Sequence, residues 1–68
     1  MVSVTHYEIL ILTVLQYSAR KLNTKDIAYS AKMDYATANK YLHGLLKKNM
    51  VYHKKIGRIN YWECKEVV

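Results

Sequence analysis

The hydrophobic pattern of this 68-residue chain changes its period at Met50. Before that residue, apolar side chains recur at the 3.6-residue spacing of helices. After it, two β-prone runs, 51–56 and 59–64, flank Gly57-Arg58. A two-residue turn with Gly first is typical of a β-hairpin. The sequence therefore predicts an α+β, mainly α, domain spanning 1–68, with three helices followed by a two-stranded hairpin over about 50–64.

The first helix is predicted at about 5–20, where Thr5 and Glu8 form a capping box by bonding each other's backbone N–H groups. One apolar stripe is expected to face the core: Tyr7, Leu10, Ile11, Val14 and Tyr17. A second, uncharged face is expected to form a homodimer interface: Ile9, Leu12, Thr13 and Gln16. The alternative is that the domain itself covers both sides of this helix. The next segment, 21–23, is an extended connector that can form a single bridge to the hairpin.

The second and third helices are predicted at about 24–32 and 35–48, with Thr24 and Asp34 as their N-caps. The third helix separates its faces well, and its inward residues are Ala38, Leu42 and Leu45. Asn49 follows this helix and suits the left-handed position that ends many helices.

Basic residues concentrate on the third helix and the hairpin. The chain has a formal net charge of +6, and no acidic residue occurs between Tyr35 and Trp62. The same stretch contains Lys40, Lys47, Lys48, Lys54, Lys55 and Arg58. This charge placement favours double-stranded DNA as the partner. The alternative is a solvated basic surface that keeps the chain soluble.

Several classes of protein are not expected. A single cysteine excludes an internal disulfide and fits a reducing compartment. No apolar run is long enough for a membrane span, and no leader pattern opens the chain, so we expect a cytoplasmic protein (in the host cytoplasm if the gene is viral or plasmid-borne). The histidines and the cysteine lack metal-ligand spacing. No nucleophile–base pattern or Gly-rich phosphate loop is present, so we expect no enzyme, cofactor or small-molecule ligand.

The order of these elements resembles a winged helix-turn-helix domain of small prokaryotic, archaeal or archaeal-virus transcription regulators. The resemblance covers about four fifths of the chain and rests on the stretches 24–28, 33–38, 42–45, 48–51 and 57–62. The family usually has Gly where this chain has Lys32 and Asn49. No single motif is specific, and the combined order and spacing carry the resemblance.

The resemblance implies that the third helix enters the major groove and that the hairpin, or wing, contacts the backbone or the minor groove. Asn39 suits an adenine edge, and Lys40 a guanine or a phosphate. Arg58 at the turn suits a narrow minor groove. The full set of expected DNA-contacting residues is Thr24, Lys25, Tyr29, Tyr35, Ala36, Thr37, Asn39, Lys40, His43, Lys47, Lys54, Lys55 and Arg58. The alternative function is a winged-helix protein-interaction module without sequence-specific DNA binding.

Overall fold

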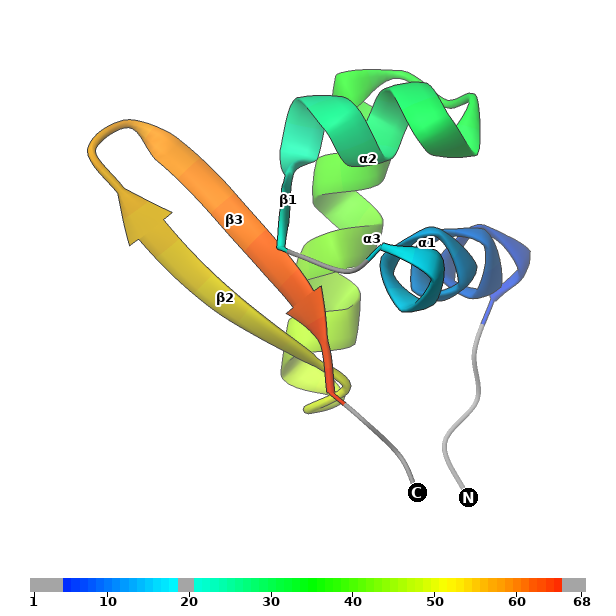
Figure 1. Cartoon of the computed structure of the whole chain (residues 1–68). Coiled ribbons are helices and arrows are strands. Elements are labelled where there is room, and N and C mark those ends of the chain that lie inside the picture. Colours follow the sequence, from blue (N-terminus) through cyan, green and yellow to red (C-terminus); the bar gives the residue numbers. More distant parts are fainter. Residues whose placement is uncertain (1–4, 19–20, 66–68) are drawn as a thin grey trace.

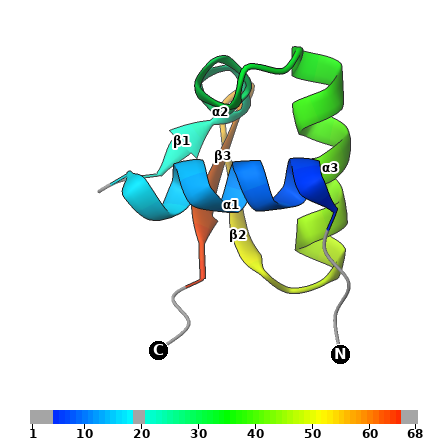
Figure 2. The ribbon, with the colours of Figure 1, turned by 90° about the vertical axis from the view of Figure 1, so that its right-hand side faces the viewer.

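A computed structural model describes residues 5–18 and 21–65. Its elements follow in the order α1 (His6–Tyr17), β1 (Leu22–Asn23), α2 (Thr24–Ala31), α3 (Tyr35–Lys47), β2 (Val51–Ile56) and β3 (Ile59–Cys64). The three helices pack on one side of the sheet, α1 crosses α3, and the β2–β3 hairpin projects beyond the helices (Figures 1 and 2). Among the described residues, no helix is long and apolar enough to cross a membrane.

The sheet has three antiparallel strands in the order β1-β3-β2. Leu22 of β1 lies opposite Trp62 of β3, and Asn23 lies opposite Tyr61. The expectation of a two-stranded wing is therefore wrong, and the bridge considered for the 21–23 connector is a strand. Pairing with β3 satisfies backbone groups of the connector, but a two-residue strand is too short to show alternating hydrophobicity in the sequence.

The hairpin turn agrees with the prediction. Ile56 lies opposite Ile59, which leaves Gly57 and Arg58 as a two-residue loop. Gly57 has a φ of 63°, a backbone conformation that a residue with a Cβ adopts at a cost. The register also fixes which side chains share a face, because successive residues of a strand point to opposite sides of the sheet.

Two of the three predicted helix caps are confirmed. Thr5 and Glu8 form the capping box, and Asp34 caps α3 by accepting the Thr37 N–H at 3.0 Å. The expected cap of α2 is wrong, because the side chain of Asn23 accepts the backbone N–H of Asp26 at 2.7 Å. Thr24 is instead the first helical residue, and its hydroxyl is turned into the core.

Left-handed residues end two of the helices. Asn49, with a φ of 62°, occupies the position predicted for it after α3. Lys32 ends α2 with a φ of 56° and a ψ of 48°. A lysine in this conformation lacks the local side-chain hydrogen bonds by which Asn tolerates it, so Lys32 is a strained point in the fold.

The core lies where the helices meet the sheet. Its largest fully buried side chains come from every layer: Trp62, Ile11, Ile27, Leu42, Leu45 and Val51. Trp62 on β3 is 0% exposed, and its indole N–H donates to the Thr24 hydroxyl at 2.8 Å. This bond joins the sheet to the start of α2.

The orientation of α1 differs from the expected one. Its buried residues are Glu8, Ile11 and Leu15, and Leu12 packs against the core beside them. Tyr17, which was expected to face inward, is 88% exposed. The helix ends at Tyr17, because Ser18 is already extended, and residues 19–20 of the longer predicted helix lie outside the described residues. Since α1 is apolar on several sides, periodicity alone does not determine its rotation.

A buried ion pair explains why an acidic residue lies on the inward face of α1. The Glu8 carboxylate accepts hydrogen bonds from Lys48 Nζ at 2.8 and 3.0 Å and from the Thr5 N–H at 2.8 Å. Burial raises the pKa of Glu8, but these hydrogen bonds outweigh that effect and lower it overall. A Cβ at Gly44 would lie 3.2 Å from this carboxylate, so Gly44 permits the close approach of α1. Lys48 therefore belongs to the fold and not to the basic surface.

Candidate nucleic-acid interface

The outward face of α3 has the composition that the sequence predicted. Four of its side chains are exposed: Ala36, Lys40, His43 and Lys47. Tyr35 is also exposed at the start of the helix, whereas Thr37 and Asn39 are half-buried at the edges of this face. The opposite face is fully buried through Ala38, Leu42 and Leu45, as expected. Packing of this inner face fixes the rotation of α3, so the set of outward residues is determined by the core.

The wing presents its basic residues on two different faces. Alternation along β2 places Lys55 on the same side of the sheet as His53, toward α3, and Lys54 on the opposite side. Lys54, Lys55 and Arg58 are all exposed. In this register Lys54 and Lys55, both expected to contact DNA, point to opposite faces of the wing. Lys55 and Arg58 lie on the side and at the tip that continue the α3 surface.

The start of α2 adjoins this surface. A hollow of about 210 Å³ lies between the two helix starts and the wing tip, lined in part by Lys25, Tyr35, Arg58 and Asn60. Lys25 and Tyr29 on α2 are exposed. The side chain of Thr24 is buried and bonded to Trp62, so it does not reach the surface as the sequence analysis expected.

Trp62 connects the wing to α3 through contacts with two aromatic rings. Its indole stacks on the His53 ring of β2 at 4.4 Å and meets the edge of the His43 ring of α3 at 5.3 Å. His53 and Asn60 are further joined across the strands by a 2.8 Å hydrogen bond. His53 and Asn60 were missed by sequence reasoning. The alternation of residues along the two hairpin strands could have identified them, because it places both on the same inward face as Trp62.

Within the described structure, neither α3 itself nor the inward face of the wing contains a carboxylate, and the nearest one in sequence is Asp34 at the start of α3. Glu8 is paired with Lys48, and Asp34 caps α3, where hydrogen bonds from the side chain and backbone of Thr37 lower its pKa. Asp26 lies in the first turn of α2, and Glu63 lies on the outer face of the sheet beside Tyr52. All charged residues on the exposed surface of α3 and on the inner side of the wing are therefore basic.

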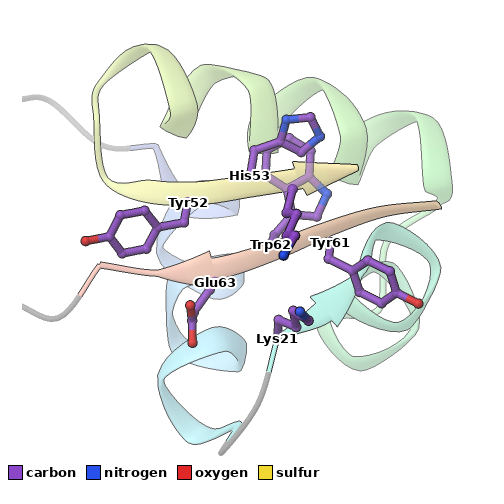
Figure 3. Close-up of a pocket in the computed structure, with 7 residues that line it drawn as sticks. Lys21, Tyr52, His53, Tyr61, Trp62 and Glu63 are labelled. Atoms are coloured by element: carbon purple, nitrogen blue, oxygen red, sulfur yellow. The ribbon is translucent and has the colours of Figure 1, made fainter. Parts of the chain in front are cut away.

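The outer face of the sheet is a second surface that the sequence analysis did not identify. Tyr52, which is 56% exposed, and Tyr61 lie diagonally across β2 and β3, with Lys21 and Glu63 nearby (Figure 3). The Nζ atom of Lys21 lies 5.8 Å from the Tyr61 ring centroid, a cation–π distance. Every second residue of β2 and β3 lies on the face of the sheet away from the buried Trp62. This alternation is the sequence signal for the outer face.

Comparisons with known proteins identify the fold. No family model and no curated protein matches the sequence. The crystal structure of Lactococcus lactis ZitR, a zinc-responsive member of the MarR family, has a TM-score of 0.80 at 24% identity and covers 96% of this chain and 46% of that chain. Sso10a-2, a DNA-binding protein from Sulfolobus solfataricus, has a TM-score of 0.72 at 24% identity and covers 93% and 65%.

A third similar structure is an enzyme. Human N-acetylserotonin methyltransferase, crystallised with SAM, has a TM-score of 0.78 at 12% identity and covers 88% of this chain but 17% of that chain. The chain thus spans less than two thirds of each of these three proteins. Three helices and a three-stranded antiparallel sheet, together with these likenesses, are consistent with a winged-helix fold. Because this fold occurs in proteins of different activity, function has to be argued from the surface.

Proposed function

We propose that the chain is the double-stranded DNA-binding domain of a sequence-specific transcription regulator. The observation that carries the proposal is the set of exposed basic residues on α3 and the inner side of the wing, Lys40, Lys47, Lys55 and Arg58, with no acidic residue within α3 or on that face of the wing. α3 lies in the major groove, and the wing tip reaches the adjacent backbone or minor groove. The likeness to a DNA-binding protein and to a MarR-family regulator supports this role.

Two kinds of contact are expected from this surface. Lys40, which is exposed on α3, reaches a guanine or a phosphate, and Asn39, half-buried at the edge of the same face, pairs with the edge of an adenine. Arg58 at the turn enters the minor groove, where the potential is most negative. Phosphate contacts come mainly from Lys25, Lys47 and Lys55, which surround α3 on its exposed side.

Salt dependence tests the DNA proposal. Affinity for a random duplex is measured by fluorescence anisotropy over a series of salt concentrations. Five or six neutralised phosphates give a log–log slope of roughly −5, because each contact releases condensed counterions. Absence of binding at low salt, or an affinity that does not change with salt, would refute the proposal.

Substitutions separate base recognition from anchoring. Asn39→Ala is expected to cost about 1–3 kcal/mol on the preferred site and to relax base preference there. Lys55→Ala weakens all sequences about equally and reduces the salt slope by about 1. Lys54→Ala is the matched control, because it removes the same charge from the adjacent residue on the opposite face of the wing. An unchanged base preference in Asn39→Ala would exclude α3 as the reading element.

A homodimer through α1 is the proposed quaternary state. The exposed side of this helix has no charged residue among its described positions and includes Ile9, 50% exposed, together with Thr13, Gln16 and Tyr17. Leu12 was expected in this interface, but it packs against the core of its own domain and is not part of the proposed interface. Two-fold association would present two recognition helices to neighbouring half-sites.

Sedimentation of the wild type and of Ile9→Glu/Thr13→Glu tests the dimer. Both positions are exposed, so the variant is expected to remain folded and to become monomeric. A wild type that is monomeric at tens of micromolar, roughly the range of a weak specific dimer, would contradict the proposal.

The second candidate function is protein interaction through the outer face of the sheet. The exposed Tyr52, Ile56 and Ile59 favour it, because tyrosine and aliphatic side chains are common at the centres of protein interfaces. Substitution of Tyr52 by Ala would impair this function and leave duplex binding unchanged, whereas Lys40→Ala would have the reverse effect.

A further inference from the structure

Two histidines meet at the junction between the recognition helix and the wing. The ring centroids of His43 on α3 and His53 on β2 are 6.3 Å apart. Both rings contact the buried indole of Trp62, His53 by stacking at an interplanar angle of 29° and His43 edge-on at 88°. Both imidazoles are themselves exposed. They therefore form a pair of solvent-facing rings where the surfaces of α3 and the wing join.

The hydrogen bond of His53 is compatible with a charged ring. Its Nε2 lies 2.8 Å from Oδ1 of Asn60, and an amide oxygen only accepts, so Nε2 carries the hydrogen. A second proton taken up by this ring goes to Nδ1 and leaves the bond to Asn60 intact. The adjacent face of the Trp62 indole favours a cation, because the ring face has a negative potential.

The charged neighbours of the pair are all basic. On α3, Lys40 and Lys47 lie one turn before and one turn after His43 on the exposed face. On β2, Lys55 shares the face of His53, and the β3 residues on that face, Asn60, Trp62 and Cys64, contribute no carboxylate. Glu63 points to the other side of the sheet, and Glu8 of α1 is paired with Lys48. An anion held between the two rings would favour their protonated forms, because it would place a negative charge beside them.

We propose that His43 and His53 together form a phosphate-binding site between α3 and the wing, and that DNA binding at this site is coupled to proton uptake. The site rests on the proposed DNA-binding function, and its ligand is a backbone phosphate of the duplex. Imidazole is the side chain that ordinarily changes charge between about pH 5 and 8. Linkage then requires that affinity rise on acidification, because the complex holds more protons than the free protein and free DNA together.

The test is the affinity for one fixed duplex between about pH 8 and pH 5.5 at constant ionic strength. Affinity of the wild type is expected to increase by about tenfold over this range, within the limit of a factor of ten per pH unit for each proton taken up. His43→Gln and His53→Gln each reduce this dependence, and the double variant removes most of it. His6→Gln is the matched control, because this third histidine lies on α1, outside the site, and its substitution leaves the pH dependence unchanged.

A second measurement uses only the wild-type protein, so it does not require that any variant folds. The Cε1 protons of the three histidines are titrated by NMR in the free wild type and in its duplex complex. His43 and His53 are expected to titrate at higher pH in the complex, whereas His6 is expected to titrate at the same pH in both. If His43 and His53 titrate at the same pH in the free protein and in the complex, or if affinity does not depend on pH, the phosphate site is refuted. The proposed duplex binding would not be affected by either result. A chain that binds no duplex at any pH or salt concentration overturns the proposed function and this site with it.

Discussion

Removing the charge of Lys48 tests the central packing argument of the fold. Lys48 Nζ donates to both oxygens of the Glu8 carboxylate, whose side chain is 3% exposed, whereas that of Lys48 is 30% exposed. Lys48→Met keeps much of the aliphatic volume and removes both hydrogen bonds. The carboxylate is then left with Thr5, whose backbone N–H and side chain both stabilise its charge.

The size of the effect follows from what the unpaired carboxyl can do. It either stays ionised in a buried place or takes up a proton. From the ordinary pKa of 4.5, neutralisation at pH 7 costs about 3.4 kcal/mol, at about 1.36 kcal/mol for each pH unit. Because solvent reaches Lys48 and already weakens the wild-type pair, we expect a total loss of about 3 kcal/mol, at the lower end for a broken buried ion pair.

Urea unfolding followed by the fluorescence of Trp62, the only tryptophan, measures this loss. In the wild type the folded pKa of Glu8 is lowered, so its contribution is complete above the unfolded value of 4.5 and is lost as pH falls through the folded value. In Lys48→Met burial dominates and raises that pKa. The variant then binds a proton on folding, so its stability deficit relative to the wild type narrows as pH falls from 7 toward about 5.

Two further variants make the result decisive. Lys47→Met is the control, because it makes the same substitution at the adjacent, exposed position of α3 and should change stability by less than about 0.5 kcal/mol. Glu8→Gln/Lys48→Met should recover part of the loss, since no charge remains buried. A loss below about 1 kcal/mol in Lys48→Met, or a deficit that does not narrow on acidification, would refute the reasoning.

Two other substitutions test particular backbone and core features. Lys32→Gly is expected to stabilise the fold by about 0.5–1 kcal/mol, because φ at this position is 56°, and a higher urea midpoint at unchanged m-value would show it. Asn49→Gly should give a smaller gain, since Asn tolerates the left-handed region. Thr24→Val leaves the buried indole N–H of Trp62 without its acceptor and should cost about 1–3 kcal/mol, whereas Thr24→Ser keeps the bond and most of the stability. Equal midpoints for the Val and Ser variants would contradict this role of the hydroxyl.

Local signals in the sequence were sufficient to predict the elements near the candidate interface. The exposed positions Ala36, Lys40, His43 and Lys47 of α3 were predicted because Ala38, Leu42 and Leu45 form one continuous inward stripe, whereas Gly44, also expected to face outward, lies against Glu8 of α1. The turn at Gly57-Arg58 and the left-handed Asn49 followed from the conformations that these residues permit within a few positions of the chain. These features depend on neighbours in sequence.

Contacts between residues far apart in the sequence determine the features that could not be predicted. The rotation of α1 depends on the pairing of Glu8 with Lys48, 40 residues away, which places an acidic side chain on the buried face. The role of Thr24 depends on Trp62, 38 residues away, which takes its hydroxyl into the core. The strand at Leu22–Asn23 and the meeting of His43 with His53 likewise arise only when the hairpin packs under the helices. Periodicity shows which side of an element is apolar, but it does not show which partner covers that side, because the partner is selected by the packing of the whole chain.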